Sequence, residues 1–252
     1  ITPVSSSNCQ VKNLRIEGNM NNNTSSNGIA VIQNANYARI ESCSISNTSL
    51  ANIDVDSEAA NSYISNNYCD TTLASSGISN FEGGGDGLIL IGNTFLNGDY
   101  ACINVSNGGS GRTATVTNNY INTTATGIGI VASIYGVISD NVFYNPGVSA
   151  IISSGPADIV GNRFEISNYN PSGVIVILQS SDPQTFSGNH FLIVNAGNTV
   201  AVTCLQCTAD RMTITGNTFQ FETSHAHIAI NVTNRQGMTI TGNTFVHYFG
   251  TA

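Results

Sequence analysis

The feature that most constrains this chain is a four-residue motif, Gly-Asn-Thr-Phe, which returns along nearly its whole length. It stands at 92–95, 216–219 and 242–245, with close variants at 161–164 and 188–191 and looser copies elsewhere. Repeat periods of roughly 20 to 50 residues indicate a stacked-repeat architecture. Aligning all copies gives ten registers, each named by its last residue, the anchor: Ile16, Ile45, Tyr68, Phe95, Tyr120, Phe143, Phe164, Phe191, Phe219 and Phe245.

The segments between the anchors have the pattern of short strands. Apolar and polar residues alternate in runs separated by Gly, Asn, Ser or Asp, and no helical period extends over a useful length. One such run recurs in successive repeats, for example at 28–32, 52–56, 127–131 and 228–232. Columns of strands that all run in one direction form parallel sheets, and parallel crossovers are right-handed. We therefore predict an all-β, right-handed parallel β-helix of about ten coils, with residues 1–252 as a single domain.

The motif itself has a structural explanation. Gly and Asn tolerate left-handed backbone, so they suit a sharp turn between two inward-facing residues. We expect the anchors to form an apolar column and the neighbouring Asn side chains to form a hydrogen-bonded ladder. Neither terminus has the pattern of a cap, and solenoids need caps; the expectation is a fragment of a longer chain. The predicted ladder comprises Asn66, Asn93, Asn118, Asn141, Asn162, Asn189, Asn217 and Asn243.

Charge is sparse and acidic. Only 9% of the residues are charged, the formal net charge is −8, and Lys12 is the single lysine. Nucleic-acid binding needs a basic face, so a nucleic-acid partner is not expected. No stretch approaches the roughly 18–20 apolar residues of a membrane span, so membrane insertion is not expected. An uncharged, hydrogen-bonding surface suits hydroxyl-rich ligands such as sugars.

The densest acidic segment, 52–58, supplies the candidate catalytic residues. If Ile53 and Val55 face the core, Asp54 and Asp56 face outward on the same side, about 6–7 Å apart. Glu82 follows one coil later. Carboxylates at this separation can act as general acid and general base around a glycosidic bond. The alternative is that an acidic chain places some carboxylates together on strands or in turns.

Polar residues in the same stretch are assigned to substrate binding. Arg39 is a further candidate for binding a sugar carboxylate, with a purely solvated role as its alternative. The predicted substrate-binding residues are Glu58, Asp86, Asp99, Tyr100, Asn104 and Arg112.

Metal and cofactor chemistry have weaker candidates. Cys204 and Cys207 have the spacing of half a zinc site, but no second half lies nearby, so packing on a strand is the preferred explanation. Glu222, His225, His227 and His247 could also gather around a metal, yet they lie near a turn close to the C-terminus. We predict neither a metal site nor a cofactor.

Coils that carry Gly-Asn-x-Phe, as at 92–95 and 161–164, resemble the right-handed parallel β-helix superfamily of pectate-lyase-like proteins. The resemblance covers nearly the whole chain, but its motifs are structural. The Gly-His-Gly and Arg-Ile-Lys elements of polygalacturonases are absent. Sparse charge and abundant Asn, Ser, Thr and Gly make the chain most similar to a bacteriophage tailspike. That resemblance implies a homotrimer on an extracellular virion tail that binds bacterial surface polysaccharide.

Three functions stay open from the sequence. The first is a tailspike-type depolymerase, a glycoside hydrolase that uses Asp54, Asp56 and Glu82. The second is a non-catalytic stalk or carbohydrate-binding β-helix. The third is a polysaccharide lyase or uronate epimerase; lyases of this superfamily use a basic residue with calcium-bound carboxylates, and here only an arginine could serve as that base.

Overall fold

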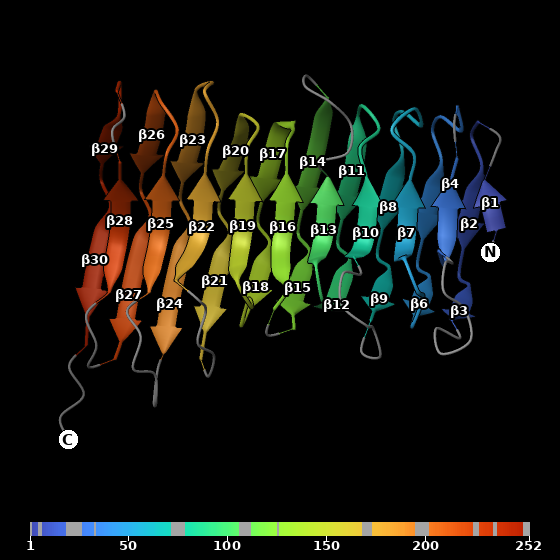
Figure 1. Cartoon of the computed structure of the whole chain (residues 1–252), viewed down its shortest axis with the longest axis horizontal. Coiled ribbons are helices and arrows are strands. Elements are labelled where there is room, and N and C mark those ends of the chain that lie inside the picture. The colour runs from blue at the N-terminus through green and yellow to red at the C-terminus, as the bar shows by residue number, and fades with distance from the viewer. Residues whose placement is uncertain are drawn as a thin grey trace.

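The computed structural model shows one rod of stacked coils with the two termini at opposite ends (Figure 1). It describes residues 2–4, 7–18, 27–32, 34–71, 79–105, 112–124, 126–167, 173–194, 202–223, 227–233 and 236–248. Within these ranges, thirty strands form three parallel sheets of ten strands each, here called A, B and C. Each coil contributes one strand to each sheet, in the order A, B, C. The predicted parallel β-helix is confirmed.

The strands have the following bounds. Sheet A contains β1 (Thr2–Val4), β4 (Ile29–Val31), β7 (Ala51–Val55), β10 (Ser79–Gly83), β13 (Ala101–Val105), β16 (Ile128–Ala132), β19 (Ser149–Ser153), β22 (Val174–Leu178), β25 (Thr203–Cys207) and β28 (Ile228–Val232). Sheet B contains β2 (Gln10–Lys12), β5 (Arg39–Glu41), β8 (Tyr63–Ser65), β11 (Leu88–Ile91), β14 (Thr113–Thr117), β17 (Tyr135–Ser139), β20 (Ala157–Val160), β23 (Gln184–Ser187), β26 (Met212–Thr215) and β29 (Thr239–Thr241). Sheet C contains β3 (Arg15–Glu17), β6 (Ser44–Ser46), β9 (Tyr68–Asp70), β12 (Thr94–Gly98), β15 (Tyr120–Thr123), β18 (Val142–Tyr144), β21 (Arg163–Ile166), β24 (His190–Val194), β27 (Thr218–Glu222) and β30 (Thr244–His247).

The core is a set of apolar columns that run along the rod between the three sheets. On sheet C, the rings of Phe143, Phe164, Phe191 and Phe219 are buried and stacked, with successive centroids 4.5 to 5.0 Å apart. Phe245 extends the stack at 5.3 Å from Phe219 but is 57% exposed. Identical side chains therefore pack on one another from coil to coil, as the repeat predicts.

A ladder of asparagine side chains follows the corner between sheets B and C. Asn93 is typical: its Oδ1 accepts from the backbone N and the Nδ2 of Asn67, at 2.9 and 3.0 Å. Its Nδ2 donates to the carbonyl oxygen of Ile64 at 3.0 Å. The predicted ladder was wrong at two rungs, because Asn67 and Asn119 occupy it in place of Asn66 and Asn118. Asn66 and Asn118 instead take the left-handed position one residue earlier, with φ of 54° and 55°.

The same one-residue slip affects two predicted anchors. Phe95 pairs with Cys69 on one side and with Ile121 on the other, so these two residues continue the core column. Tyr68 and Tyr120 are 43% and 38% exposed on the outer face of sheet C. A shift of one residue in a strand exchanges its two faces. The tyrosines were assigned to the core because they are aromatic, whereas the smaller Cys69 and Ile121 fill that place.

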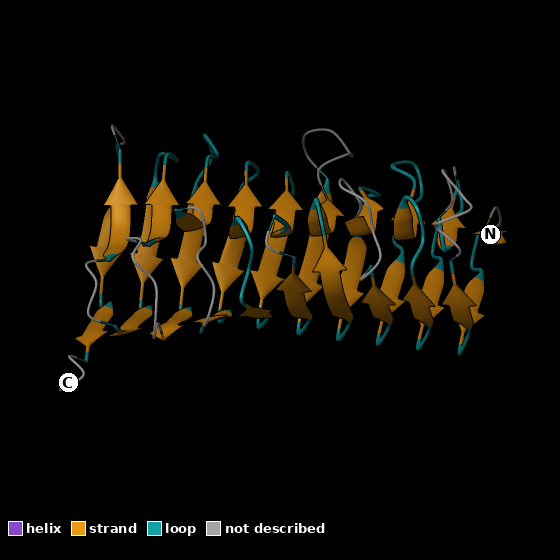
Figure 2. Cartoon of the chain, turned by 60° about the horizontal axis from the view of Figure 1, so that its bottom comes forward, coloured by secondary structure: helices purple, strands orange, loops and turns teal. Residues whose placement is uncertain are grey.

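Three corners connect the sheets, and Figure 2 shows the strands in columns with the loops between them. The A–B corner joins sheet A to sheet B, and the C–A corner joins sheet C to the sheet A strand of the next coil. The outer face of sheet A therefore lies between the A–B corner and the C–A corner. No helix among the described residues is long and apolar enough to cross a membrane.

Candidate functional site

The candidate site starts from a column of outward residues on sheet A. In β7, Ile53 and Val55 are buried, and Asp54 between them faces outward, half-buried. Asp54 lies in register with Glu82 of β10, and Glu82 lies in register with Asn104 of β13. Neighbouring parallel strands are about 4.8 Å apart. Three successive coils therefore present two carboxylates and an amide in one line.

Asn27 holds the carboxylate of Asp54. Its Nδ2 donates to Oδ2 of Asp54 at 2.7 Å, and its Oδ1 accepts from the backbone N of Ala51 at 3.0 Å. Asn27, two residues before β4, thus contacts both the first residue of β7 and its outward-facing Asp54. This contact orients the Asp54 carboxylate toward its neighbours.

The pKa of Asp54 is raised above the ordinary value for aspartic acid. Partial burial is the largest cause, because it disfavours the charged form, and the neighbouring carboxylate of Glu82 adds to it. The hydrogen bond from Asn27 acts in the opposite direction, and Asp56 contributes a smaller repulsion. A carboxyl group that stays protonated to a higher pH beside a second carboxylate has the character of a general acid.

Asp56 lies just beyond the end of β7, at the A–B corner. Its backbone N donates to the carbonyl oxygen of Val31 at 2.8 Å, and its Oδ1 accepts from the backbone N of Glu58 at 2.9 Å. The Asp56 side chain therefore shapes a turn while still lining the site. Glu82 is the closer structural counterpart of Asp54, because the two residues are paired across adjacent strands.

These carboxylates line a hollow of about 300 Å³ on sheet A, here called the acidic hollow. Gly83 allows the two strands to approach at this point, since a Cβ built there would lie 2.6 Å from the carbonyl oxygen of Val55. The residues that line the acidic hollow are Asn27, Leu50, Asp54, Val55, Asp56, Ser57, Glu82 and Gly83. All three predicted catalytic residues are brought together there.

Five of the six predicted substrate-binding residues lie at the two corners, and the sixth, Asn104, lies on β13. At the A–B corner, Asp86 accepts from the backbone N and the hydroxyl of Thr113, at 2.9 and 2.7 Å, and these bonds lower its pKa. Arg112 donates through Nη1 to the carbonyl oxygens of Ser57 and Gly84, the latter at 2.7 Å. The Arg112 side chain thus ties three coils together at this corner.

The remaining predicted residues lie elsewhere around sheet A. Glu58 is exposed at the A–B corner. At the C–A corner, Asp99 accepts from the hydroxyls of Thr126 and Thr124, at 2.7 and 3.2 Å, and Tyr100 is 46% exposed. Asn104 is buried in the column with Glu82. None of the six residues predicted to bind substrate lines the acidic hollow, so their role stays a prediction.

Two residues of the site were missed by the sequence reasoning. Asn27 ends an asparagine- and serine-rich stretch, so nothing in composition distinguishes it from its neighbours. Leu50 precedes β7 and is 46% exposed at the edge of the hollow. The one signal in the sequence was the position of Leu50 directly before the acidic strand. Because the alternation assigns leucine to the core, its exposure at the hollow was not expected.

The candidate metal ligands do not converge among the described residues, which contain no group of three His, Cys, Asp or Glu side chains placed to hold an ion. Cys204 and Cys207 are buried in β25, and burial raises the pKa of both thiols, that of Cys207 to about 12. They pack as small apolar residues. His225 of the C-terminal candidate cluster lies outside the described residues.

Comparison with known proteins supports the fold. The family model described as a right-handed beta helix region matches residues 3–164, well over half of the chain. Searches of curated proteins and of solved structures each found no match. The match supports the predicted right-handed architecture, and this fold is consistent with a protein that binds or acts on carbohydrate.

Proposed function

The chain belongs to the right-handed β-helix family, and from that premise we propose that its acidic hollow binds a polysaccharide and hydrolyses it. The observation that carries the proposal is the pairing of Asp54 with Glu82 across β7 and β10, with the pKa of Asp54 raised. Two carboxyl groups in unequal environments supply the acid and the base that glycoside hydrolysis requires.

In the proposed reaction, Asp54 is the general acid. Its protonated carboxyl group donates a proton to the oxygen of the leaving sugar as the glycosidic bond breaks. Glu82 either directs a water molecule to the anomeric carbon, or bonds to that carbon itself and is released when water hydrolyses the covalent intermediate, with Asp54 then taking the proton of the water. Asn27 positions Asp54 through its 2.7 Å hydrogen bond, and Asp56 adds negative charge that stabilises the positive charge developing on the sugar ring.

The spacing of the two carboxyl groups sets the stereochemistry. Retaining enzymes hold their carboxyl groups about 5–5.5 Å apart, and inverting enzymes about 6.5–9.5 Å apart. The Asp54 and Glu82 side chains leave paired positions on adjacent strands whose backbones are about 4.8 Å apart, so we propose retention with Glu82 as the nucleophile. Asp56 lies beyond the end of β7 and is not paired with Asp54 across strands.

The biological setting is part of the proposal. We propose a tailspike-type depolymerase, a homotrimer outside the cell that acts on bacterial surface polysaccharide. Its support is the family match together with the low charge and the Asn-, Ser- and Thr-rich surface. Sedimentation analysis tests the trimer, and a monomer at micromolar concentration would contradict that part of the proposal.

A lyase or uronate epimerase is the second candidate, and a non-catalytic stalk is the third. A lyase of this superfamily would need a basic residue close to its substrate, whereas the described residues that line the acidic hollow include no Lys, Arg or His. This composition favours hydrolysis by paired carboxyl groups over elimination.

One experiment separates these functions. The protein is incubated with a panel of bacterial capsular and O-antigen polysaccharides, and the products are followed by mass spectrometry and ultraviolet absorbance. Hydrolysis predicts fragments that have gained one water molecule and show no new absorbance. Unsaturated, absorbing fragments would indicate a lyase, an altered uronate without cleavage would indicate an epimerase, and tight binding without turnover would indicate a stalk or binding module.

A further inference from the structure

A second hollow lies where the A–B corner meets sheet B in the first two coils. It has a volume of about 370 Å³ and is lined by Asn8, Gln10, Tyr37 and Arg39. We call it the N-terminal hollow, and among the described residues the two hollows have no lining residue in common. We propose that the N-terminal hollow is a separate glycan-binding site that takes a carboxylate-bearing sugar. The proposal concerns binding alone and does not depend on the proposed hydrolysis.

The backbone of Tyr37 is the first observation. Its φ is +61°, in the left-handed region that bulky residues disfavour. Gln10, Tyr63 and Ile89 share one column of sheet B with Arg39. The positions equivalent to Tyr37, two residues before each of them, are Asn8, Asn61 and Gly87, with φ of 60°, 56° and 70°. The corner thus requires left-handed backbone, and neighbouring coils meet this requirement with residues that tolerate it.

The tyrosine gains no compensating burial. Tyr37 is 55% exposed, so its ring is presented to solvent beside the hollow instead of packing in the core. A bulky residue held in left-handed backbone without a packing benefit motivates a hypothesis of function, and at Tyr37 the lining of a hollow accompanies it. An exposed tyrosine ring supplies a flat apolar surface for the C–H face of a sugar and a hydroxyl for hydrogen bonding.

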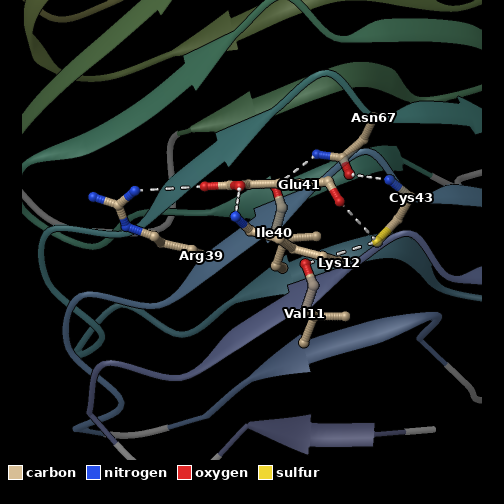
Figure 3. Close-up of polar contacts among 7 residues, drawn as sticks. All are labelled: Val11, Lys12, Arg39, Ile40, Glu41, Cys43 and Asn67. Atoms are coloured by element: carbon tan, nitrogen blue, oxygen red, sulfur yellow. Dashed lines mark hydrogen bonds and ion pairs between the residues drawn. The ribbon is translucent and has the colours of Figure 1, made fainter.

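The electrostatics of the hollow are the second observation. Lys12 Nζ lies 2.6 Å from Oε2 of Glu41, and Arg39 Nη1 lies 3.5 Å from Oε1 of the same carboxylate (Figure 3). Two cations thus share one anion, which leaves local positive charge on a chain whose net charge is −8. An anionic ligand complements this surface.

Arg39 is placed to use that charge. Its guanidinium lies 5.4 Å from the centroid of the Tyr63 ring, which orients it, while its side chain stays 58% exposed. A guanidinium matches a carboxylate with two parallel hydrogen bonds. Asn8 and Gln10, both exposed, supply amide donors and acceptors for sugar hydroxyl groups. The combination of one guanidinium, two amides and a tyrosine suits a uronate residue within a glycan.

The repeat supplies substitutions that should preserve the fold. Tyr37→Asn places at this corner the residue type found at Asn8 and Asn61, and it relieves the backbone strain. Arg39→Gln introduces the residue that Gln10 provides in the same column one coil earlier. Arg211→Asn is the matched control. Arg211 has the charge of Arg39 and the left-handed backbone of Tyr37, with φ of 55°, but it lies in a distant coil.

The test is isothermal titration calorimetry of the intact protein with tri-galacturonate, with the neutral galactose trisaccharide and with inorganic phosphate. We expect tri-galacturonate to bind and the neutral sugar to bind more weakly. Tyr37→Asn and Arg39→Gln should each weaken uronate binding about tenfold or more, without lowering the melting temperature. Arg211→Asn and Asp54→Asn should leave that affinity unchanged.

Three results would overturn the proposal. Equal affinity for the neutral trisaccharide would exclude a role for the carboxylate, and displacement of the sugar by equimolar phosphate would reduce the site to a simple anion site. Unchanged uronate affinity in both hollow variants would place binding elsewhere. Because Asp54→Asn removes the proposed general acid, binding that persists in this variant is independent of whether hydrolysis occurs.

Discussion

Asp54 occupies a position that costs the folded protein stability. The pKa of Asp54 is raised in the folded state, so the protein binds this proton more tightly when folded than when unfolded. The contribution of protonated Asp54 to the free energy of unfolding is fully present below the ordinary aspartate pKa of about 3.9. This contribution is lost as the pH rises through the folded-state pKa. At neutral pH the ionised carboxylate is therefore a net cost that its neighbours impose.

Asp54→Asn should therefore stabilise the protein at neutral pH. Asparagine is isosteric, has no charge to desolvate, and can still accept the hydrogen bond from Asn27. We expect a gain below about 1 kcal/mol at pH 7, because solvent screens a half-exposed carboxylate, and no difference near pH 3. Thermal unfolding followed by circular dichroism at both pH values measures this, and a variant less stable than wild type at pH 7 would contradict it.

At the residue scale, the sequence predicts which way a side chain faces wherever apolar and polar residues alternate along a strand. Ile53 and Val55 set the phase of β7, so Asp54 was correctly expected to face outward, near Glu82 of the next coil. Asn27 could not be predicted, because its contact with Asp54 joins residues 27 positions apart in a stretch where most residues are Asn, Ser or Thr. The roles of Glu58, Asp86, Asp99, Tyr100, Asn104 and Arg112 stay predictions.

At the scale of elements, the asparagine ladder determines how successive coils are joined. Asn141 is fully buried, and its Oδ1 accepts from the backbone N of Asn119 at 2.9 Å. Its Nδ2 donates to the carbonyl oxygen of Val116 at 2.9 Å and to Oδ1 of Asn162 at 3.0 Å. The ladder satisfies backbone groups at a corner where the strands provide no partner.

Asn141→Ala should be strongly destabilising. The substitution leaves the buried backbone N of Asn119 without its acceptor, and the expected loss is about 2–4 kcal/mol in the free energy of unfolding. Asn122→Ala, on the outer face of β15, is the control and should change that free energy by about 0.5 kcal/mol or less. Urea denaturation of both variants tests the ladder, and equal losses would show that it contributes no specific stability.

The ladder also shows why the strand registers were wrong at two coils. In 65–68 and 117–120 two asparagines stand side by side, and either could align with Asn93. Alignment on the first asparagine predicts Tyr68 and Tyr120 in the core, where the other anchors include phenylalanine. The structure places the second asparagine in the ladder, since the left-handed position before it accepts asparagine as readily as glycine.

On the scale of the whole molecule, stability depends on position along the rod. Each coil contacts only its neighbours, so a central residue is packed on both sides and a terminal one on a single side. Phe164 is fully buried between Phe143 and Phe191, whereas Phe245, in the same column, is 57% exposed. Ten coils could be predicted because the anchors count them. The exposure of Phe245 could not be predicted, because the motif is the same in central and terminal coils.

Truncating these two phenylalanines should therefore have unequal effects. Phe164→Ala should lower the free energy of unfolding by about 3–5 kcal/mol, because it leaves a cavity in the middle of the stack. Phe245→Ala should lower it by about 1 kcal/mol or less, since the ring already faces solvent over most of its surface. Urea denaturation measures both, and comparable losses would mean that another surface covers the last coil in solution.

The central claim is that Asp54 and Glu82 together cleave a polysaccharide, and the initial rate of reducing-end release tests it most directly. On the polysaccharide that the panel identifies, Asp54→Asn and Glu82→Gln should each lower the rate by about 10² to 10⁴-fold while retaining the wild-type circular dichroism spectrum. Asp158→Asn, which removes an exposed carboxylate from sheet B, should keep the wild-type rate. Wild-type rates in either Asp54→Asn or Glu82→Gln would contradict the assignment of the acidic hollow as the active site.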